Sequence, residues 1–126
     1  MPSGTSEARV ISVIDDDESV RNAVRSLLRS LGYRVAVFAS GEDFMGSEHI
    51  DDTACLIIDV RMPGMSGLDL QRRLLAASRR IPIIFITGLD DDDARRQALD
   101  AGALAFLRKP FREQTLMDAV RSACKV

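Results

Sequence analysis

The segment 55–67, CLIIDVRMPGMSG, decides which fold this chain can adopt. Its apolar run, 56–58, ends on Asp59, and one proline and two glycines then interrupt regular structure before a helical pattern starts at Leu68. A short β-branched run bounded by turn-forming residues is typical of a strand buried on both faces. On this segment alone, Asp59 either caps a turn or points into a crevice where it has a chemical role.

Similar apolar runs recur along the chain and alternate with segments of helical periodicity. Between residues 19 and 31 the apolar residues recur at i, i+4, i+7, i+8 and i+11, which places them on one face of a helix that Gly32 ends. The expected strands are 10–14, 34–38, 56–59, 83–86 and 105–107, and the expected helices are 19–31, 40–46, 68–77, 94–101 and 113–124.

This alternation predicts an α/β fold, namely a doubly wound five-stranded parallel sheet in the order 2-1-3-4-5 with five flanking helices. Ligands of such folds bind at the carboxyl ends of the strands, where the strand order reverses between strands 1 and 3. The polar residues that follow the strands are therefore expected to converge there: Asp15, Asp16 and Asp17 after strand 1, Asp59 after strand 3, Thr87 after strand 4 and Lys109 after strand 5.

Converging carboxylates repel one another and raise each other's pKa unless a cation lies between them. Magnesium is the expected ion, because it prefers oxygen ligands and needs only one or two protein carboxylates. A carboxylate beside Mg²⁺ is also an acceptable nucleophile for a phosphoryl group, and Asp59 is the candidate. Lys109 and Thr87 are expected to neutralise and bind the other phosphoryl oxygens, and the bond from Lys109 to Pro110 is a candidate cis peptide.

Composition narrows the class of protein further. A chain of 126 residues predicts one domain, here 10–126, preceded by a flexible tail over 1–9. A net charge of −2 gives no reason to expect that this domain binds nucleic acid or a membrane, and no apolar run approaches the ~20 residues of a membrane span. Cys55 and Cys124 lack metal-ligand spacing and are expected to be reduced, buried thiols, which is compatible with the cytoplasm.

Four motifs in this order resemble the receiver domain of bacterial two-component response regulators. They are DDD at 15–17, IIDVRMPGMSG at 57–67, ITG at 86–88 and FLRKPF at 106–111, and the resemblance extends over 10–126. It implies a flavodoxin-like fold, a cytoplasmic signalling domain that catalyses only its own phosphorylation and dephosphorylation, and a sensor histidine kinase as partner.

The resemblance also implies a role for each residue of the site. Asp59 is the expected phosphoacceptor. Asp16 is the expected direct ligand of Mg²⁺, Asp15 acts on the ion through water, and the backbone carbonyl of Arg61 completes the protein ligands.

The resemblance further implies that Thr87 and Lys109 contact the phosphoryl group and that Phe106 turns inward when Thr87 moves toward it. The sequence segment DVRMPGMSGLDLQRRL most resembles receivers of the LuxR/FixJ-type branch, which precede a helix-turn-helix domain that regulates transcription. Phosphorylation is then expected to promote a homodimer through the face formed by the fourth helix, the fifth strand and the fifth helix.

Several alternatives stay open on the sequence. The chain ends at Val126, so it is either a receiver excised from a longer regulator or a stand-alone regulator that acts by protein contact. An aspartate-nucleophile phosphatase would need a general acid where Arg61 stands, and a binding module with a vestigial pocket would not bind Mg²⁺.

Some residues also have a purely structural interpretation. The acids at 90–93 precede a predicted helix and are expected to interact favourably with the positive end of its dipole. Phe106 also fits a plain core position, and we expect Arg61 and Leu89 to tune the lifetime of the phosphoryl group.

Overall fold

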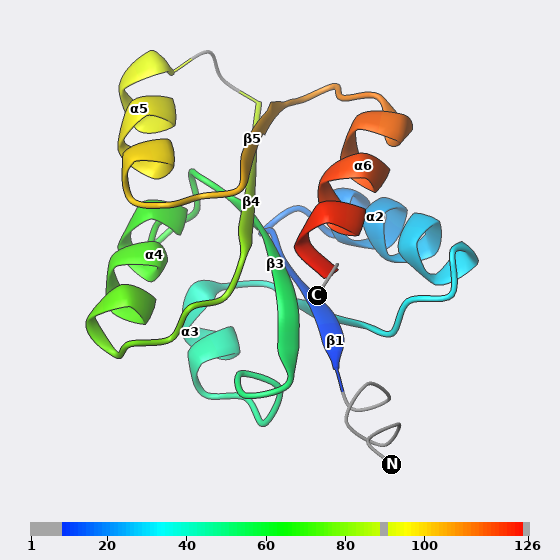
Figure 1. The fold of residues 1–126 in the computed structure, drawn as a ribbon, viewed down its shortest axis with the longest axis horizontal. Helices are drawn as coiled ribbons and strands as arrows, with labels where there is room; N and C mark the ends of the chain where they lie inside the picture. Colours follow the sequence, from blue (N-terminus) through cyan, green and yellow to red (C-terminus); the bar gives the residue numbers. More distant parts are fainter. Residues whose placement is uncertain (1–8, 89–90, 125–126) are drawn as a thin grey trace.

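The computed structural model describes residues 9–88 and 91–124 and contains one five-stranded parallel sheet in the order β2-β1-β3-β4-β5 (Figure 1). This order and the five flanking helices confirm the predicted architecture. The strands are β1 (Val10–Ile14), β2 (Val35–Phe38), β3 (Thr53–Asp59), β4 (Ile83–Thr87) and β5 (Ala105–Arg108). The helices are α2 (Glu18–Ser30), α3 (Gly41–Met45), α4 (Gly67–Ala76), α5 (Asp92–Asp100) and α6 (Glu113–Cys124).

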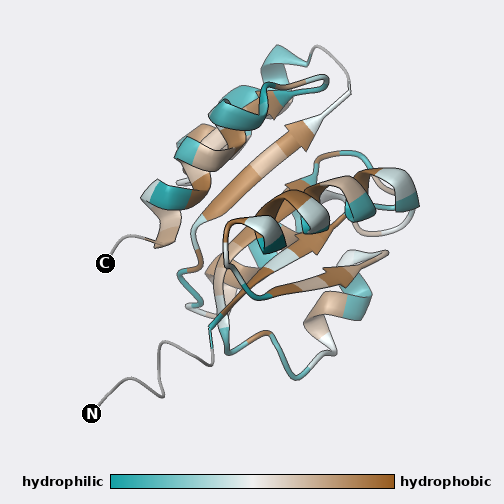
Figure 2. Ribbon diagram, turned by 90° about the vertical axis from the view of Figure 1, so that its right-hand side faces the viewer, coloured by the Kyte–Doolittle hydropathy of each residue, from teal (hydrophilic) through white to brown (hydrophobic). Residues whose placement is uncertain are grey.

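Helices cover both faces of the sheet and divide the core in two. Alternate residues of β3 point to opposite faces, so that Leu56 and Ile58 pack with α3, α4 and α5, whereas Cys55 and Ile57 pack with α2 and α6. Figure 1 shows these two groups of helices on either side of the sheet, and Figure 2 shows the strands as its most hydrophobic segments. All seven residues of β3 are buried, as expected for a central strand of a doubly wound sheet.

Two boundaries differ from the sequence prediction by more than one residue. Strand β3 begins at Thr53, three residues before the apolar run, because Thr53 pairs with Val10 of β1 and its hydroxyl lies 2.8 Å from the hydroxyl of Ser12. The Thr53 hydroxyl donates to the carbonyl of His49 and accepts from the Ser12 hydroxyl, so both buried hydroxyl groups have partners and a polar residue extends the strand. Helix α5 begins at Asp92 rather than Ala94.

Helix caps explain where the helices that border the site begin. Ser66 and Asp69 form a capping box at the start of α4, and Asp17 accepts a hydrogen bond from the Ser19 N–H at the start of α2. Asp91 caps α5, and Asp92 and Asp93 lie in its first turn, which confirms the dipole interpretation of these acids.

Parts of three predictions fall on residues that the structure does not describe: the tail at 1–8, Asp90 in the acidic run, and Leu89. In the ranges that are described, no helix has both the length and the apolar composition needed to cross a membrane.

Candidate functional site

Asp59 is the last residue of β3, and the backbone around it is fixed on two sides. The Val60 N–H donates to the carbonyl of Ile86 in β4, and the Gly67 N–H donates to the carbonyl of Val60. Gly67 approaches the strand so closely that a Cβ atom there would lie 2.5 Å from the carbonyl oxygen of Asp59. Only glycine fits this contact, so the loop between Asp59 and α4 returns tightly onto the strand.

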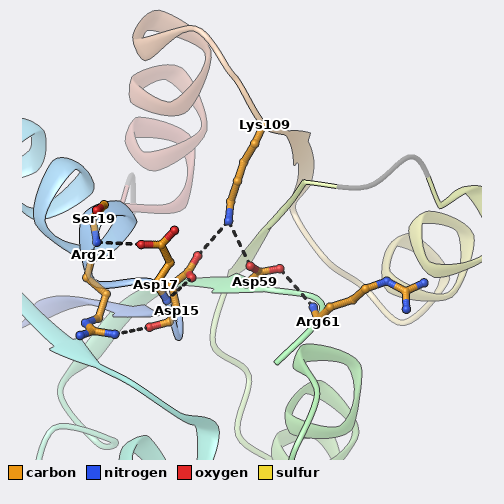
Figure 3. A network of polar contacts seen from close by, with 7 residues as sticks. All are labelled: Asp15, Asp17, Ser19, Arg21, Asp59, Arg61 and Lys109. Carbon is orange, nitrogen blue, oxygen red and sulfur yellow. Dashed lines mark hydrogen bonds and ion pairs between the residues drawn. The ribbon is translucent and has the colours of Figure 1, made fainter. Parts of the chain in front are cut away.

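The amine of Lys109 lies between two carboxylates at the carboxyl end of the sheet. Its Nζ atom is 3.0 Å from Oδ2 of Asp59 and 3.1 Å from Oδ2 of Asp15 (Figure 3). The Lys109 N–H donates to the carbonyl of Thr87, and the peptide bond from Lys109 to Pro110 is cis, as the sequence suggested. Burial alone would lower the pKa of Lys109, but the hydrogen bonds and charges of Asp59 and Asp15 outweigh it and raise that pKa above its ordinary 10.5.

Asp15 is fully buried although its neighbour Asp16 is exposed. Burial raises the pKa of Asp15, while the Asp17 N–H, which donates to its Oδ1 at 2.9 Å, and Lys109 act in the opposite direction. The side chain of Arg21 in α2 donates to the backbone carbonyl of Asp15 at 2.7 Å and so holds the turn in place. No sequence signal pointed to Arg21, because a long arginine can reach many positions from one helix face.

Three carboxylates form a group suited to a divalent cation. Asp15, Asp16 and Asp59 each offer an oxygen, and these oxygens lie within 4.8 Å of one another. An all-oxygen set with two buried acids and one exposed acid fits Mg²⁺, which keeps several water ligands. The Arg61 N–H donates to Oδ1 of Asp59 at 3.1 Å, so the backbone of Arg61 also lies at this site.

Thr87 lies on β4, which pairs with the strand of Asp59, and Phe106 lies on β5, the next strand along the sheet. Thr87 ends β4 and is 1% exposed. Phe106 is half-buried in β5, and its ring centroid lies 6.1 Å from that of Phe85 in the core. Thr87 therefore lies at the carboxyl edge of the sheet next to Asp59, whereas Phe106 lies one strand farther away and contacts the core, and the switching roles predicted for both residues remain predictions.

One interaction at the edge of the site was missed by sequence reasoning. The guanidinium of Arg61 forms an ion pair with Asp91, the residue that caps α5. The hydrogen bond from the Ala94 N–H and the contact with Arg61 both lower the pKa of Asp91. Thirty positions separate the two residues, so no local spacing could have revealed the pair.

Comparisons with known proteins match this geometry to a family. Residues 11–121 match the family described as "Response regulator receiver domain". The chain is 48% identical over 117 residues to the response regulator protein TmoT of Ectopseudomonas mendocina, covering 93% of this chain and 53% of that protein. It is 38% identical over 117 residues to the transcriptional regulatory protein FixJ of Azorhizobium caulinodans, covering 93% of this chain and 56% of that protein.

Solved structures give the same result for the fold. The crystal structure of FixJ-N superposes with a TM-score of 0.83 at 32% identity and covers 93% of this chain and 94% of that one. The chain spans about half the length of the two curated relatives, whereas it matches FixJ-N over nearly its whole length.

Proposed function

The chain belongs to the response regulator receiver domain family, and from this membership we propose that it acts in the cytoplasm and accepts a phosphoryl group on Asp59 from a sensor histidine kinase. The observation that carries the proposal is the position of the Lys109 amine, 3.0 Å from Asp59 and 3.1 Å from Asp15. A cation fixed against a buried strand-end carboxylate is already placed to neutralise charge on an incoming phosphoryl group.

The transfer follows from these contacts. A carboxylate oxygen of Asp59 attacks the phosphorus atom of the kinase phosphohistidine and forms a new P–O bond. The P–N bond breaks and its electron pair stays on the imidazole nitrogen. That nitrogen then takes a proton from solvent, which leaves the kinase histidine as a neutral imidazole. Lys109 follows the negative charge from the free carboxylate to the phosphoryl oxygens, and hydrolysis later returns the Asp59 carboxylate and inorganic phosphate.

Mg²⁺ is the proposed cofactor, with Asp16 and Asp59 as direct ligands together with the Arg61 carbonyl, and with Asp15 acting through water. The fit of the three clustered acids to a hard cation supports this assignment. When bound, the ion neutralises the negative charge that collects between the carboxylates and the phosphoryl group. Burial raises the pKa of Asp15, so the apoprotein holds an acid that is costly to ionise until a cation is bound.

Phosphorylation is proposed to shift an existing equilibrium between two conformations, with Thr87 moving toward the phosphoryl group and Phe106 turning inward. The affected face is formed by α5, β5 and α6, which are the fourth helix, fifth strand and fifth helix of the predicted fold. We propose that this face forms a homodimer and that a longer regulator uses the dimer to control transcription, since the relative FixJ is a transcriptional regulatory protein. A stand-alone regulator would use the same face for protein contacts.

Acetyl phosphate provides the direct test. The protein is incubated with acetyl phosphate and Mg²⁺, and its intact mass is measured by mass spectrometry. We expect one added phosphoryl group in the wild type and none in Asp59→Asn, with loss of labelling when EDTA removes the metal. Absence of the added mass from the wild type, or an equal addition to Asp59→Asn, would overturn the proposal.

A further inference from the structure

We propose that Arg61 is a cation with two alternative partners: Asp91 in the unphosphorylated protein and the phosphoryl group on Asp59 after phosphorylation. In this account Asp91 is a positioning residue that acts on the site through Arg61, and the exchange releases the first turn of α5 from the loop after Asp59. The inference rests on the proposed function and adds a route by which phosphorylation reaches α5.

Arg61 contacts Asp59 through its backbone and Asp91 through its side chain. Its backbone N–H contacts the Asp59 carboxylate, yet its guanidinium lies 2.5 Å from Oδ2 of Asp91. Figure 3 shows the side chain leading away from Asp59. The Arg61 side chain is 59% exposed, so it is not packed in place, and its flexible stem starts beside the acceptor carboxylate.

Asp91 uses its two carboxylate oxygens to contact two different parts of the fold. Its Oδ1 accepts the hydrogen bond from the Ala94 N–H that caps α5, and its Oδ2 accepts from Arg61. A single carboxylate therefore joins the start of α5 to the loop that follows Asp59. Loss of Arg61 removes this connection and leaves the cap intact.

The two ends of α5 are held by different kinds of contact. Near the C-terminal end, the buried side chain of Gln71 in α4 donates to the carbonyl of Ala98 at 3.0 Å. At the N-terminal end, Arg61 and Asp91 border a groove of about 460 Å³ that Met62, Leu68 and the first turns of α5 also line. The exposed ion pair between Arg61 and Asp91 is a weaker contact than the buried hydrogen bond from the Gln71 amide. We therefore expect α5 to move at its N-terminal end.

The two partners of Arg61 differ in charge and in the number of acceptor oxygens that they offer. An exposed ion pair with one carboxylate contributes little to stability, because water screens it. An aspartyl phosphate beside Arg61 carries more negative charge and offers several strong acceptor oxygens, which suit the planar fork of a guanidinium. Arg61 is therefore expected to prefer the phosphoryl group and to give up its ion pair with Asp91 when Asp59 is phosphorylated.

The experiment uses beryllofluoride as the phosphoryl mimic and measures its binding in the presence of Mg²⁺ by fluorine NMR. Asp91→Asn keeps an oxygen that caps α5 but removes the charge that holds Arg61, so we expect binding ~2- to 5-fold tighter than in the wild type. In the Arg61→Gln background the same change is expected to have no effect, because no cation is left to release. Asp93→Asn removes a charge from the same helix turn but pairs with Arg96, and it is the matched control.

Amide hydrogen exchange of the first turn of α5 gives a second readout. Beryllofluoride is expected to speed exchange at residues 94 and 95 in the wild type, and Asp91→Asn is expected to show faster exchange before the mimic is added. The inference would be overturned if Asp91→Asn tightened binding equally with and without the Arg61→Gln change, if Asp93→Asn had an equal effect, or if binding and exchange were unchanged. A wild type that takes neither acetyl phosphate nor beryllofluoride would instead overturn the proposed function.

Discussion

Replacing Gly67 with alanine tests how closely α4 packs against the strand that carries Asp59. The new Cβ atom would lie 2.5 Å from the Asp59 carbonyl oxygen and 3.0 Å from Cε1 of Phe85. The first contact is with backbone in a fully buried strand, so rotation of a side chain cannot relieve it. Overpacking of a core costs about 1–3 kcal/mol, and the rigid partner places Gly67→Ala in the upper half of that range.

Urea denaturation followed by circular dichroism measures this loss, with an unchanged m-value as the check that unfolding stays two-state. Gly46→Ala is the matched control, because its added Cβ would lie 3.6 Å from the Glu42 carbonyl oxygen and its φ of −89° suits alanine. The control is expected to change the free energy of unfolding by less than about 1 kcal/mol. The close contact would be refuted if Gly67→Ala matched the wild type in both stability and labelling by acetyl phosphate.

Three further predictions concern titratable groups. Burial raises the pKa of Asp15 in the folded protein above 3.8, so without Mg²⁺ the free energy of unfolding falls as pH rises from 3.8 through the raised pKa. Asp15→Asn should therefore be more stable than the wild type at pH 7. An equal or lower urea midpoint for Asp15→Asn would contradict this. The backbone N–H of Ser66 lowers the pKa of Asp69, so the ionised carboxylate stabilises the fold above pH 3.8, and this stabilisation is lost as pH falls through the lowered pKa. In acid unfolding curves, Asp69→Asn should therefore lose less stability than the wild type over that pH range. Burial raises the thiol pKa of Cys55 and Cys124, so iodoacetamide at pH 8 should modify Cys124 slowly and Cys55 more slowly still, with both fast in urea.

Hydrophobic periodicity was enough to predict the strands, because buried parallel strands are nearly continuous apolar runs, and the alternation of strands with helices then predicted the doubly wound strand order. It failed at the start of β3, where Thr53 is buried through a hydroxyl pair with Ser12 rather than through apolar contact. It also placed the start of α5 too late, because Asp92 belongs to the helix that Asp91 caps. Both errors concern polar residues. Thr53 pairs with a residue distant in sequence, and the start of α5 is set by a hydrogen bond between the Asp91 side chain and the backbone.

The convergence of Asp15, Asp59 and Lys109 followed from topology alone, since the carboxyl ends of adjacent parallel strands meet at one edge. The ion pair of Arg61 with Asp91 did not follow, because long arginine side chains reach across loops whose spacing the strand order does not determine. The same holds for the Arg21 contact to the Asp15 carbonyl. Strand ends were thus predictable, and the side chains that connect loops to one another were not.

Trapping the phosphoryl group by chemical reduction identifies which acid of the cluster accepts it. Borohydride reduces an aspartyl phosphate to homoserine, and peptide mass spectrometry then identifies the modified position. After incubation with acetyl phosphate and Mg²⁺, we expect homoserine at Asp59 and at no other acid of the cluster. Homoserine at Asp15 or Asp16, or its absence from every position, would contradict it.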